Sequence, residues 1–468
     1  MSDIFGIDFG TTNSCISRLN KGKPEVISID DSPIVPSIVS FTDQETIVGN
    51  RARNRALLYP EDTVSSIKRS LGEDSSINIR GKSYTPEDIA ATVLDYLKTN
   101  AEQACQTTVR HAVITVPAYF SDAQRRATKK AGELAGLEVE RIINEPTAAA
   151  LFYDYLGITG SEGGEQQVLV YDLGGGTFDV SVLCVGELTE VLASTGNTQL
   201  GGDDFDNLLL NYLLEHILDS REVDLSGHRP ALARLKQAAE RAKIQLSSHA
   251  YTQVDETMIP THNGQYVDIN LELDRPTLEN MVSDYLRETR LETHRALREA
   301  KLQAEMIDKV LLVGGTTRMP AVTRLLEEDF GSSRMPVVDP DLAVAKGAAI
   351  QAGIIQGSHI HQVLIDVTSH TLSTEALVDA FSYQLQCVPI IPRNTQIPVT
   401  RSESFRTVQD YQAYVEVKVF QGESTEPEEN TFIGSLGLDL VPAPVGSTVI
   451  VEYSYDLNGI IHVKVEQK

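Results

Sequence analysis

Two short segments of the chain each join an aspartate to glycine and threonine residues at the end of an apolar strand pattern. The first reads Ile7-Asp8-Phe9-Gly10-Thr11-Thr12-Asn13, and the second reads Tyr171-Asp172-Leu173-Gly174-Gly175-Gly176-Thr177-Phe178-Asp179. One fixed offset pairs Asp8 with Asp172, Gly10 with Gly174 and Ser17 with Ser181. This self-similarity predicts two related lobes that face each other across a cleft.

The chemistry that suits these residues is the binding of a polyphosphate. Glycine turns let backbone N–H groups reach anionic oxygens, and threonine hydroxyls add further donors. The aspartates would repel phosphate unless a divalent cation with its waters lies between, which is the coordination that Mg²⁺ prefers. One segment alone is equally consistent with a tight turn, but two in register favour a nucleotide triphosphate bound with Mg²⁺.

Further positions would complete such a pocket. The apolar run from Lys309 to Val313 breaks into Gly314 and Gly315 and is followed by Arg318. A planar guanidinium can stack on a nucleotide base, so this segment predicts an adenosine site.

Asn144-Glu145-Pro146 reads as the start of a helix, with Asn144 as the cap and Pro146 in the first turn. Glu145 would then be held where a carboxylate can orient water, although simple capping is the alternative reading. Lys68 has no distinguishing local context.

Apolar strand patterns alternate with helical patterns as far as about residue 355, which predicts an α/β fold. For example, Ala112–Pro117 reads as a strand, and the helix that follows is capped at Ser121 and ended by Gly136. Pro230–Ser248 reads as a long amphipathic helix that would form one wall of the nucleotide pocket.

Composition sets the outer limits. The 468 residues, 41% of them hydrophobic, suffice for several cores, and the length predicts about three domains. A net charge of −26 would repel nucleic acid and anionic lipid, so we expect neither as a partner.

The four cysteines (Cys15, Cys105, Cys184 and Cys387) have no paired spacing, which favours a reducing compartment over a disulfide framework or a zinc site. The sequence begins without a basic region followed by a long apolar stretch, and no apolar run is long enough to span a membrane. We therefore expect a cytoplasmic location. His359, His361 and His370 do not predict a metal site, because no cysteine or carboxylate spacing supports them.

The pattern of strands alternating with helices ends near Gly357. Val363-Leu364-Ile365-Asp366 is a short apolar run that ends in an acid; it is either an edge strand or a segment that docks in one nucleotide state and is released in another. From Val367 to Lys468, alternating strand patterns such as Tyr414–Val419 and Ile461–Glu466 predict a β-sandwich. Asn458-Gly459 predicts a tight hairpin turn with φ > 0 at both residues.

These motifs together resemble the heat-shock protein 70 chaperones of the DnaK type. The resemblance is carried by the segments Gly6–Ser14, Val116–Phe120, Arg141–Ala150, Asp172–Asp179 and Leu312–Gly315. It implies an α/β actin-like ATPase of two lobes and four subdomains, followed by a small all-β sandwich. The implied domains are residues 1–358 for the ATPase, 359–366 for the interdomain linker and 367–468 for a truncated substrate-binding sandwich.

The resemblance also implies roles for individual residues in ATP hydrolysis. Asp8, Asp172 and Asp179 would hold Mg²⁺ through water; Lys68 would position the attacking water, with Glu145 and Thr177 close by. Hydrolysis would then be slow and would depend on placement and charge neutralisation more than on a strong base. The implied contacts to the phosphates and the nucleoside are Gly10, Thr11, Thr12, Asn13, Gly174, Gly175, Gly176, Thr177, Gly201, Gly202, Glu240, Lys243, Ser247, Gly314, Gly315, Arg318 and Asp341. ADP is the implied product, and the family also implies K⁺.

For the remaining parts of the chain, the resemblance implies a coupling mechanism and partners. Val363, Leu364, Ile365 and Asp366 match the family's linker. Phe405, Val415 and Val417 match apolar groups of its peptide cleft, although each is equally consistent with plain sandwich core. The implied partners are unfolded or apolar peptide segments, a J-domain co-chaperone that contacts Arg141 and Asp366, and a nucleotide exchange factor.

Two departures from the family pattern stand out. The stretch Leu377–Pro392 is longer than its counterpart and lacks the usual glycine pair, so we expect reshaped loops over a bound peptide. The sequence ends at Lys468, which leads us to expect no last sandwich strand and no helical lid, and therefore faster release of a bound peptide.

Three function classes follow from the sequence. We favour an ATP-driven, peptide-binding chaperone. A small-molecule kinase shares the phosphate clamp but needs a catalytic acid near its acceptor and has no need of the terminal sandwich. A nucleotide-gated interaction or filament protein without a client cleft is the third alternative.

Overall fold

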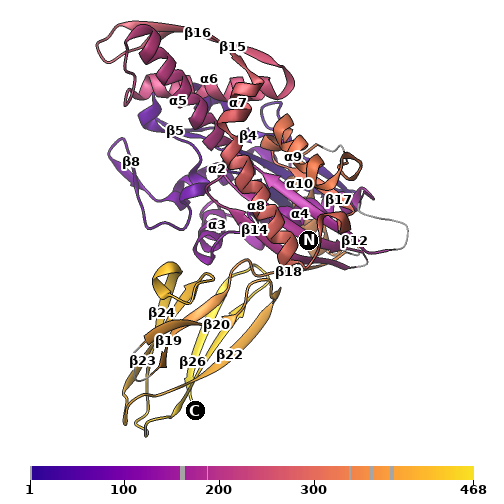
Figure 1. Cartoon of the computed structure of the whole chain (residues 1–468), viewed down its shortest axis with the longest axis vertical. Helices are drawn as coiled ribbons and strands as arrows, with labels where there is room; N and C mark the ends of the chain where they lie inside the picture. Colours follow the sequence, from indigo (N-terminus) through magenta and orange to yellow (C-terminus); the bar gives the residue numbers. More distant parts are fainter. Residues whose placement is uncertain are drawn as a thin grey trace.

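The computed structural model describes residues 3–158, 164–186, 188–336, 339–358, 360, 362–379 and 384–468. Figure 1 shows an α/β body that carries the N-terminus and, below it, a separate layered body of strands that carries the C-terminus. The predicted order, an α/β domain followed by an all-β sandwich, is confirmed.

Two mixed sheets form the centre of the α/β body, and four strands of each follow the same order. In the first, β1 (Ile4–Phe9) pairs antiparallel with β2 (Asn13–Asn20) and parallel with β10 (His111–Val116). In the second, β12 (Gln166–Leu173) pairs antiparallel with β13 (Phe178–Val185) and parallel with β17 (Lys309–Val313). In the first sheet, β3 (Lys23–Val26) follows β2 and β11 (Glu138–Asn144) flanks β10; in the second, β14 (Leu188–Asn197) follows β13, and strands from later in the chain lie beyond it.

The register of the two central hairpins confirms the internal repeat. Asp8 lies opposite Cys15 across the first hairpin, and Asp172 lies opposite Asp179 across the second. Each aspartate therefore occupies the same place, next to the last pair of its ladder, as the sequence offset predicts.

Two alanine-rich helices, α4 (Glu145–Tyr155) and α10 (Ala343–Ile355), pack together in the core that the two sheets share. Their backbones approach closely: a Cβ added to Gly347 would lie 1.7 Å from the carbonyl oxygen of Ala148. Glycine is thus required at this crossing for steric reasons.

The other helices surround the sheets, and two of them match the sequence prediction closely. α3 begins after Ser121, whose hydroxyl and Gln124 form a capping box, and Gly136 follows its end with φ 77°. The helices besides α4 and α10 are α1 (Asn50–Arg55), α2 (Pro86–Cys105), α3 (Asp122–Leu134), α5 (Gly202–Arg221), α6 (Arg229–Ser248), α7 (Arg275–Met281), α8 (Ser283–Glu299) and α9 (Pro320–Phe330). No helix among the described residues combines the length and apolar character that crossing a bilayer requires.

Small antiparallel sheets extend each lobe away from the centre. On the first lobe, β5 pairs with β6 and β7, and β8 pairs with β9; on the second, β15 and β16 form a hairpin that α6 packs against. Their bounds are β5 (Val39–Phe41), β6 (Thr46–Val48), β7 (Thr63–Val64), β8 (Ile77–Ile79), β9 (Lys82–Tyr84), β15 (Tyr251–Pro260) and β16 (Tyr266–Asp274). The short strand β4 (Val35–Pro36) pairs with β2 of the first central sheet instead.

Beyond β18 (Val363–Val367), two sheets with the orders β20-β19-β23-β24 and β22-β25-β26 form the sandwich. The predicted alternation is confirmed, since Val417 and Val419 are buried in the core between the sheets while Tyr414 and Glu416 are exposed. The strand bounds are β19 (Leu372–Asp379), β20 (Gln384–Ile391), β22 (Val399–Arg406), β23 (Tyr414–Gln421), β24 (Thr431–Asp439), β25 (Thr448–Tyr455) and β26 (Ile461–Gln467). The short strand β21 (Gln396–Ile397) pairs with β18 instead.

The hairpin between β25 and β26 differs from its prediction. Five residues separate the strands, and of the predicted Asn-Gly pair only Gly459 has positive φ. Asp456 holds this longer turn, because its Oδ1 accepts hydrogen bonds from the backbone N–H groups of Asn458 (2.8 Å) and Ile460 (2.9 Å). The side chain of Asn458 makes a contact between the two bodies instead, since its Oδ1 accepts a hydrogen bond from the backbone N–H of Ile142 in the α/β body (3.0 Å).

Candidate functional site

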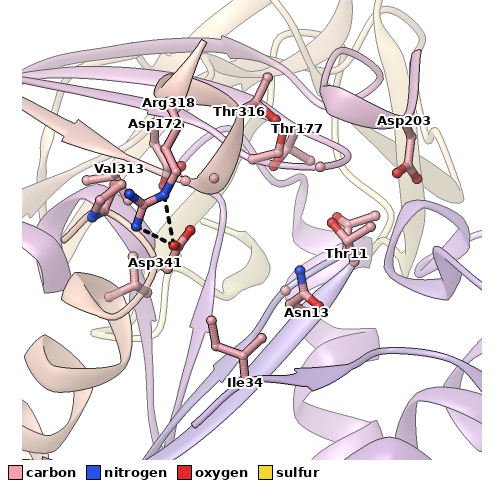
Figure 2. A pocket seen from close by; sticks show the side chains of 18 of the residues that line it. Thr11, Asn13, Ile34, Asp172, Thr177, Asp203, Val313, Thr316, Arg318 and Asp341 are labelled. Carbon is pink, nitrogen blue, oxygen red and sulfur yellow. Dashed lines mark hydrogen bonds and ion pairs between the residues drawn. The ribbon is translucent and has the colours of Figure 1, made fainter. Parts of the chain in front are cut away.

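A cavity of about 400 Å³ lies between the two lobes of the α/β body. Figure 2 shows Thr11, Asn13 and Ile34 along one side and Val313, Arg318 and Asp341 along another. Most of the predicted nucleotide-site residues line this cavity: Asp8, Gly10, Thr11, Thr12, Asn13, Lys68, Glu145, Asp172, Gly174, Gly175, Thr177, Glu240, Lys243, Ser247, Gly314, Gly315, Arg318 and Asp341.

The two glycine-threonine turns meet across the cleft. A Cβ on Gly175 would lie 1.7 Å from the hydroxyl oxygen of Thr12, and one on Gly176 would lie 2.3 Å from Cγ2 of Thr11. Side chains at these glycines would therefore block the approach of the opposite turn. The arrangement leaves backbone N–H groups and threonine hydroxyls as the donors available to an anionic ligand.

Lys68 and Glu145 form a buried ion pair at the base of the cavity. Lys68 lies in a short 3₁₀ turn (Ile67–Ser70) and is only 1% exposed, and its Nζ is 2.5 Å from Oε1 of Glu145 at the start of α4. The ammonium also lies 5.5 Å from the ring centre of Phe120. A buried charge is tolerated only when it is paired, so the pair fixes both side chains in the cavity.

Three aspartates face this pair. Burial, followed by the negative charge of Glu145, raises the pKa of Asp8 and of Asp179 to about 7. The same two causes, in the same order, raise the pKa of Asp172 well above its ordinary value. Lys68 lowers all three values in part. Carboxylates held this close in a buried site are an all-oxygen, acidic donor set, which fits a hard divalent cation such as Mg²⁺.

Asp179 is buried behind the cavity lining, where the backbone N–H of Tyr119 donates to its Oδ1 (2.9 Å). Gly176, Gly201 and Gly202 are also absent from the lining of the cavity. Gly202 supports the lining instead, because its N–H donates to the carbonyl of Gly174 (3.0 Å). A Cβ on Gly201 would lie 2.5 Å from the backbone of Gly175. Asp179, Gly176, Gly201 and Gly202 therefore lie behind the residues that line the cavity.

Three predicted nucleoside contacts, Glu240, Lys243 and Ser247, follow one face of α6 at helical spacing. Lys243 Nζ is held by Asp206 Oδ2 (2.8 Å) and by the carbonyl of Gly202 (2.9 Å). Glu240 forms an ion pair with Arg53 of the first lobe. Since Arg53 and Glu240 belong to opposite lobes, this pair bridges the cleft.

The opposite wall follows β17. Gly314 has φ 83°, and a Cβ there would lie 2.4 Å from the carbonyl oxygen of Leu173, so the turn that carries Gly315 and Arg318 requires glycine. Arg318 donates to Asp341 (2.6 Å) and to Asp339 (2.6 Å), and the first of these pairs is drawn in Figure 2. The carboxylates orient the flat guanidinium over the cavity edge.

Several lining residues were missed from the sequence: Ile34, Asp203, Asp206, Ile244, Val313, Thr316 and Met319. Asp203 and Asp206 follow Gly201-Gly202 at the start of α5, and this adjacency was the available signal. Burial raises the pKa of Asp206 to about 6, with Lys243 opposing the shift. Ile34 had no signal, since an isolated apolar residue in a loop does not mark a ligand contact.

Asn144 corrects one sequence interpretation. It is the N-cap residue of α4, but its side chain makes no capping hydrogen bond. Its Oδ1 accepts from Arg125 (2.7 Å), and its Nδ2 donates to Asp366 (2.8 Å). Asn144 therefore joins α3 to the segment that follows the α/β body, which is a tertiary role that a helix-start motif does not reveal.

Within the predicted linker, residues 359 and 361 lie outside the described residues, and Val363–Val367 forms β18. β18 adds to the edge of the second sheet by pairing parallel with β14. Asp366 is partly buried and also accepts from Thr147 (3.1 Å).

The three predicted cleft residues lie in the sandwich. Val417 is buried in the sandwich core, and Phe405 and Val415 are half-buried against it. The predicted reshaped stretch Leu377–Pro392 contains residues 380–383, which lie outside the described residues.

Comparison with known proteins agrees with this geometry. The family model described as Hsp70 protein matches residues 4–468. The chain is 46% identical to the chaperone protein DnaK of Thermotoga petrophila and 47% identical to that of Thermotoga neapolitana, in both cases over 98% of this chain and 77% of the relative. It is 45% identical to the DnaK of Ureaplasma urealyticum, over 98% of this chain and 76% of the relative. The chain therefore belongs to the Hsp70 family of ATP-dependent molecular chaperones.

Proposed function

We propose that this protein binds Mg²⁺·ATP between its two glycine-threonine turns and hydrolyses it with the buried pair of Lys68 and Glu145. The observation that carries the proposal is the geometry of this pair, fixed at 2.5 Å opposite the three aspartates. Lys68 would hold the attacking water, and Thr177 would lie near the terminal phosphate. Hydrolysis then depends on positioning and on fixed charges more than on a strong base.

Asp8, Asp172 and Asp179 would hold Mg²⁺ through its waters. When bound, the ion would neutralise phosphate charge and lower the pKa of these carboxyl groups. The same oxygen-rich surroundings support K⁺ as a further ion. On the nucleoside side, Glu240, Lys243 and Ser247 of α6 would face Arg318 and Asp341, and the approach of these two walls supports an adenosine site with ATP or ADP.

We assign residues 1–358 to the ATPase domain, 359–366 to the linker and 367–468 to a substrate-binding sandwich. The β18–β14 pairing and the contacts of Asp366 support a docked state of the linker. ATP would favour this docked state, whereas hydrolysis would release the sandwich and tighten its hold on a client. Because coupling between sites is reciprocal, client binding would in turn favour hydrolysis.

Further contacts between the two domains support this docked state. Asp122 of α3 accepts from the N–H of Ile461 (2.8 Å), and Arg393 donates to the carbonyl of Ser194 (3.1 Å). Together with the bond from Ile142 to Asn458, these contacts join the sandwich to both lobes. A change in the angle between the lobes would therefore shift the contacts that hold the sandwich.

The clients would be unfolded or apolar peptide segments held near Phe405, Val415 and Val417. A J-domain co-chaperone would contact Arg141 and Asp366 and stimulate hydrolysis, and a nucleotide exchange factor would speed release of ADP. The net charge of −26 would suit the basic face of a J-domain. The cytoplasmic location stays a prediction from the cysteine pattern.

Fluorescence anisotropy of a labelled apolar peptide tests the proposal. Binding in ADP that weakens when ATP is added supports an ATP-controlled client site. Binding that is equal in both nucleotides contradicts the coupling, and no binding in either contradicts the client cleft.

A further inference from the structure

One residue of the loop between β10 and α3 connects the sandwich to a carboxylate of the proposed Mg²⁺ site. The N–H of Tyr119 donates to Oδ1 of Asp179 (2.9 Å), and its C=O accepts from Nε2 of His370 (3.1 Å). The two rings are also in contact, with centroids 4.1 Å apart and planes tilted by 56°. The N–H and the C=O of Tyr119 belong to successive peptide groups that meet at its Cα, so a shift of His370 reaches the N–H that orients Asp179 through this one residue.

The other residues of this loop also make hydrogen bonds to both sides. Ser369, next to His370, donates to the carbonyl of Ala118. From the other side, Arg125 of α3 donates to the same carbonyl (3.0 Å) and to that of Phe120 (3.3 Å). The loop is therefore fixed between α3 and the first turn of the sandwich. Release of the sandwich would remove the bonds from Ser369 and His370 and leave those from Arg125.

The bond to Tyr119 defines the proton state of His370. A carbonyl oxygen only accepts, so Nε2 carries the hydrogen, and the neutral ring has no proton on Nδ1. A second proton would place a positive charge in an interface that already contains Arg125 and Arg393. Glu423 is the nearby carboxylate, but its oxygens already accept from the N–H (2.9 Å) and the hydroxyl (2.7 Å) of Thr371.

We propose that His370 is a positioning residue for ATP hydrolysis: in the docked state it orients Asp179 through the backbone of Tyr119, and protonation of its imidazole releases the sandwich. This inference rests on the proposed function, since it requires a docked state that ATP favours. It adds a residue of the sandwich to the machinery that arranges the nucleotide site, and it makes the coupling of the two domains sensitive to pH.

The direction of the pH effect follows from burial. Loss of contact with water lowers the pKa of docked His370 to about 4; Arg393 and Arg125 add to this effect, while the Tyr119 carbonyl and Glu423 oppose it. In the undocked state the ring would return to its ordinary value of about 6.5. The docked state therefore binds fewer protons between these values, and docking weakens as the pH falls through this window. One proton changes the docking equilibrium by at most about tenfold per pH unit.

Asp366 also titrates in this interface, with the opposite sign. Burial raises the pKa of Asp366, while Val367, Arg125, Thr147 and Asn144 oppose the shift. This carboxyl group alone would make docking stronger at lower pH. The contribution of His370 to the pH dependence of docking is therefore measured as the difference between variants with and without this histidine.

The test uses a fluorescent reporter. The protein contains no tryptophan, so Leu457→Trp, at an exposed position beside the Asn458 contact, reports docking in the full chain. His370→Gln keeps an N–H donor but does not titrate, His370→Leu removes both properties, and His249→Gln changes an exposed histidine at the end of α6. Each change is made in the reporter background.

With Mg²⁺·ATP, lowering the pH from about 7.5 to about 5.5 should weaken docking about tenfold more in the reporter protein and in His249→Gln than in His370→Gln. At pH 8, His370→Leu should need about fivefold more Mg²⁺ for half-maximal turnover, and His370→Gln should restore the normal requirement.

Equal pH dependence with and without His370, or an unchanged Mg²⁺ requirement in His370→Leu, would overturn the inference. Absence of any reporter response to Mg²⁺·ATP at pH 8 would overturn the proposed coupling itself.

Discussion

The amine of Lys68 and the carboxylate of Glu145 meet at 2.5 Å in the core of the α/β body, although 77 residues separate them in the chain. One comes from a short turn of the first lobe and the other from the first residue of α4. Each is the charge partner of the other, and both face the aspartates of the two turns. Loss of either side chain would leave the other charge buried and unpaired.

Lys68→Ala should reduce the single-turnover rate of ATP hydrolysis by about a hundredfold or more, because the attacking water loses its positioning group. The affinity for ADP should change by less than about threefold. Lys82→Ala, at an exposed position of β9, is the matched control and should behave as wild type. Unchanged turnover in Lys68→Ala would remove this residue from the mechanism.

The same substitution should also destabilise the protein, by about 3 kcal/mol, because Glu145 is left as an uncompensated buried charge. Denaturant unfolding of the nucleotide-free protein measures this effect. The double variant Lys68→Met with Glu145→Gln should recover much of the lost stability while remaining inactive. A single variant as stable as wild type would show that the pair is not buried in solution.

Binding of the metal should release protons. Without a cation, the pKa of Asp8 and of Asp179 is about 7, so these groups are partly protonated below that pH, whereas a bound divalent ion requires the ionised form. Metal affinity of the ADP complex should therefore fall as the pH is lowered from about 8 to about 6. Mn²⁺ titration followed by electron paramagnetic resonance measures it, and a flat profile would contradict the assignment of the carboxylates.

Arg318→Ala should weaken ADP binding by about tenfold, because a guanidinium stacked on a base contributes on the order of 1 kcal/mol or more. Arg324→Ala removes another exposed arginine, paired with Glu279 outside the cavity, and should leave the affinity unchanged. Calorimetric titration of ADP compares the two. Equal effects of the two substitutions would argue against a base contact at Arg318.

Asp366→Ala should weaken the docked state, because it removes the acceptor for Asn144 and Thr147. Small-angle X-ray scattering in Mg²⁺·ATP should then give a larger radius of gyration than wild type. Asp439→Ala, at an exposed position of the sandwich, is the control. A compact Asp366→Ala protein would show that the linker contacts do not hold the domains together.

How much of the structure the sequence predicts depends on whether the signal is local. The two turns, the capping box at Ser121 and the alternating strands of the sandwich arise from neighbouring residues, and all were predictable. Lys68 was predicted only through the family resemblance, because its burial depends on a partner far along the chain. The side chain of Asn144 deviated for the same reason, since its bonds to Arg125 and Asp366 outweigh its local capping preference. The turn at Asn458 deviated because the side chain of Asp456 closes a longer turn.

Isothermal titration of ATP into chelator-treated protein, with and without Mg²⁺, tests the central claim most directly. The account predicts one site per chain, with strong heat and much tighter binding in the presence of Mg²⁺, and a clear loss of that Mg²⁺ dependence in Asp172→Asn. Absence of heat with Mg²⁺·ATP, or equal binding with and without the metal, would contradict it.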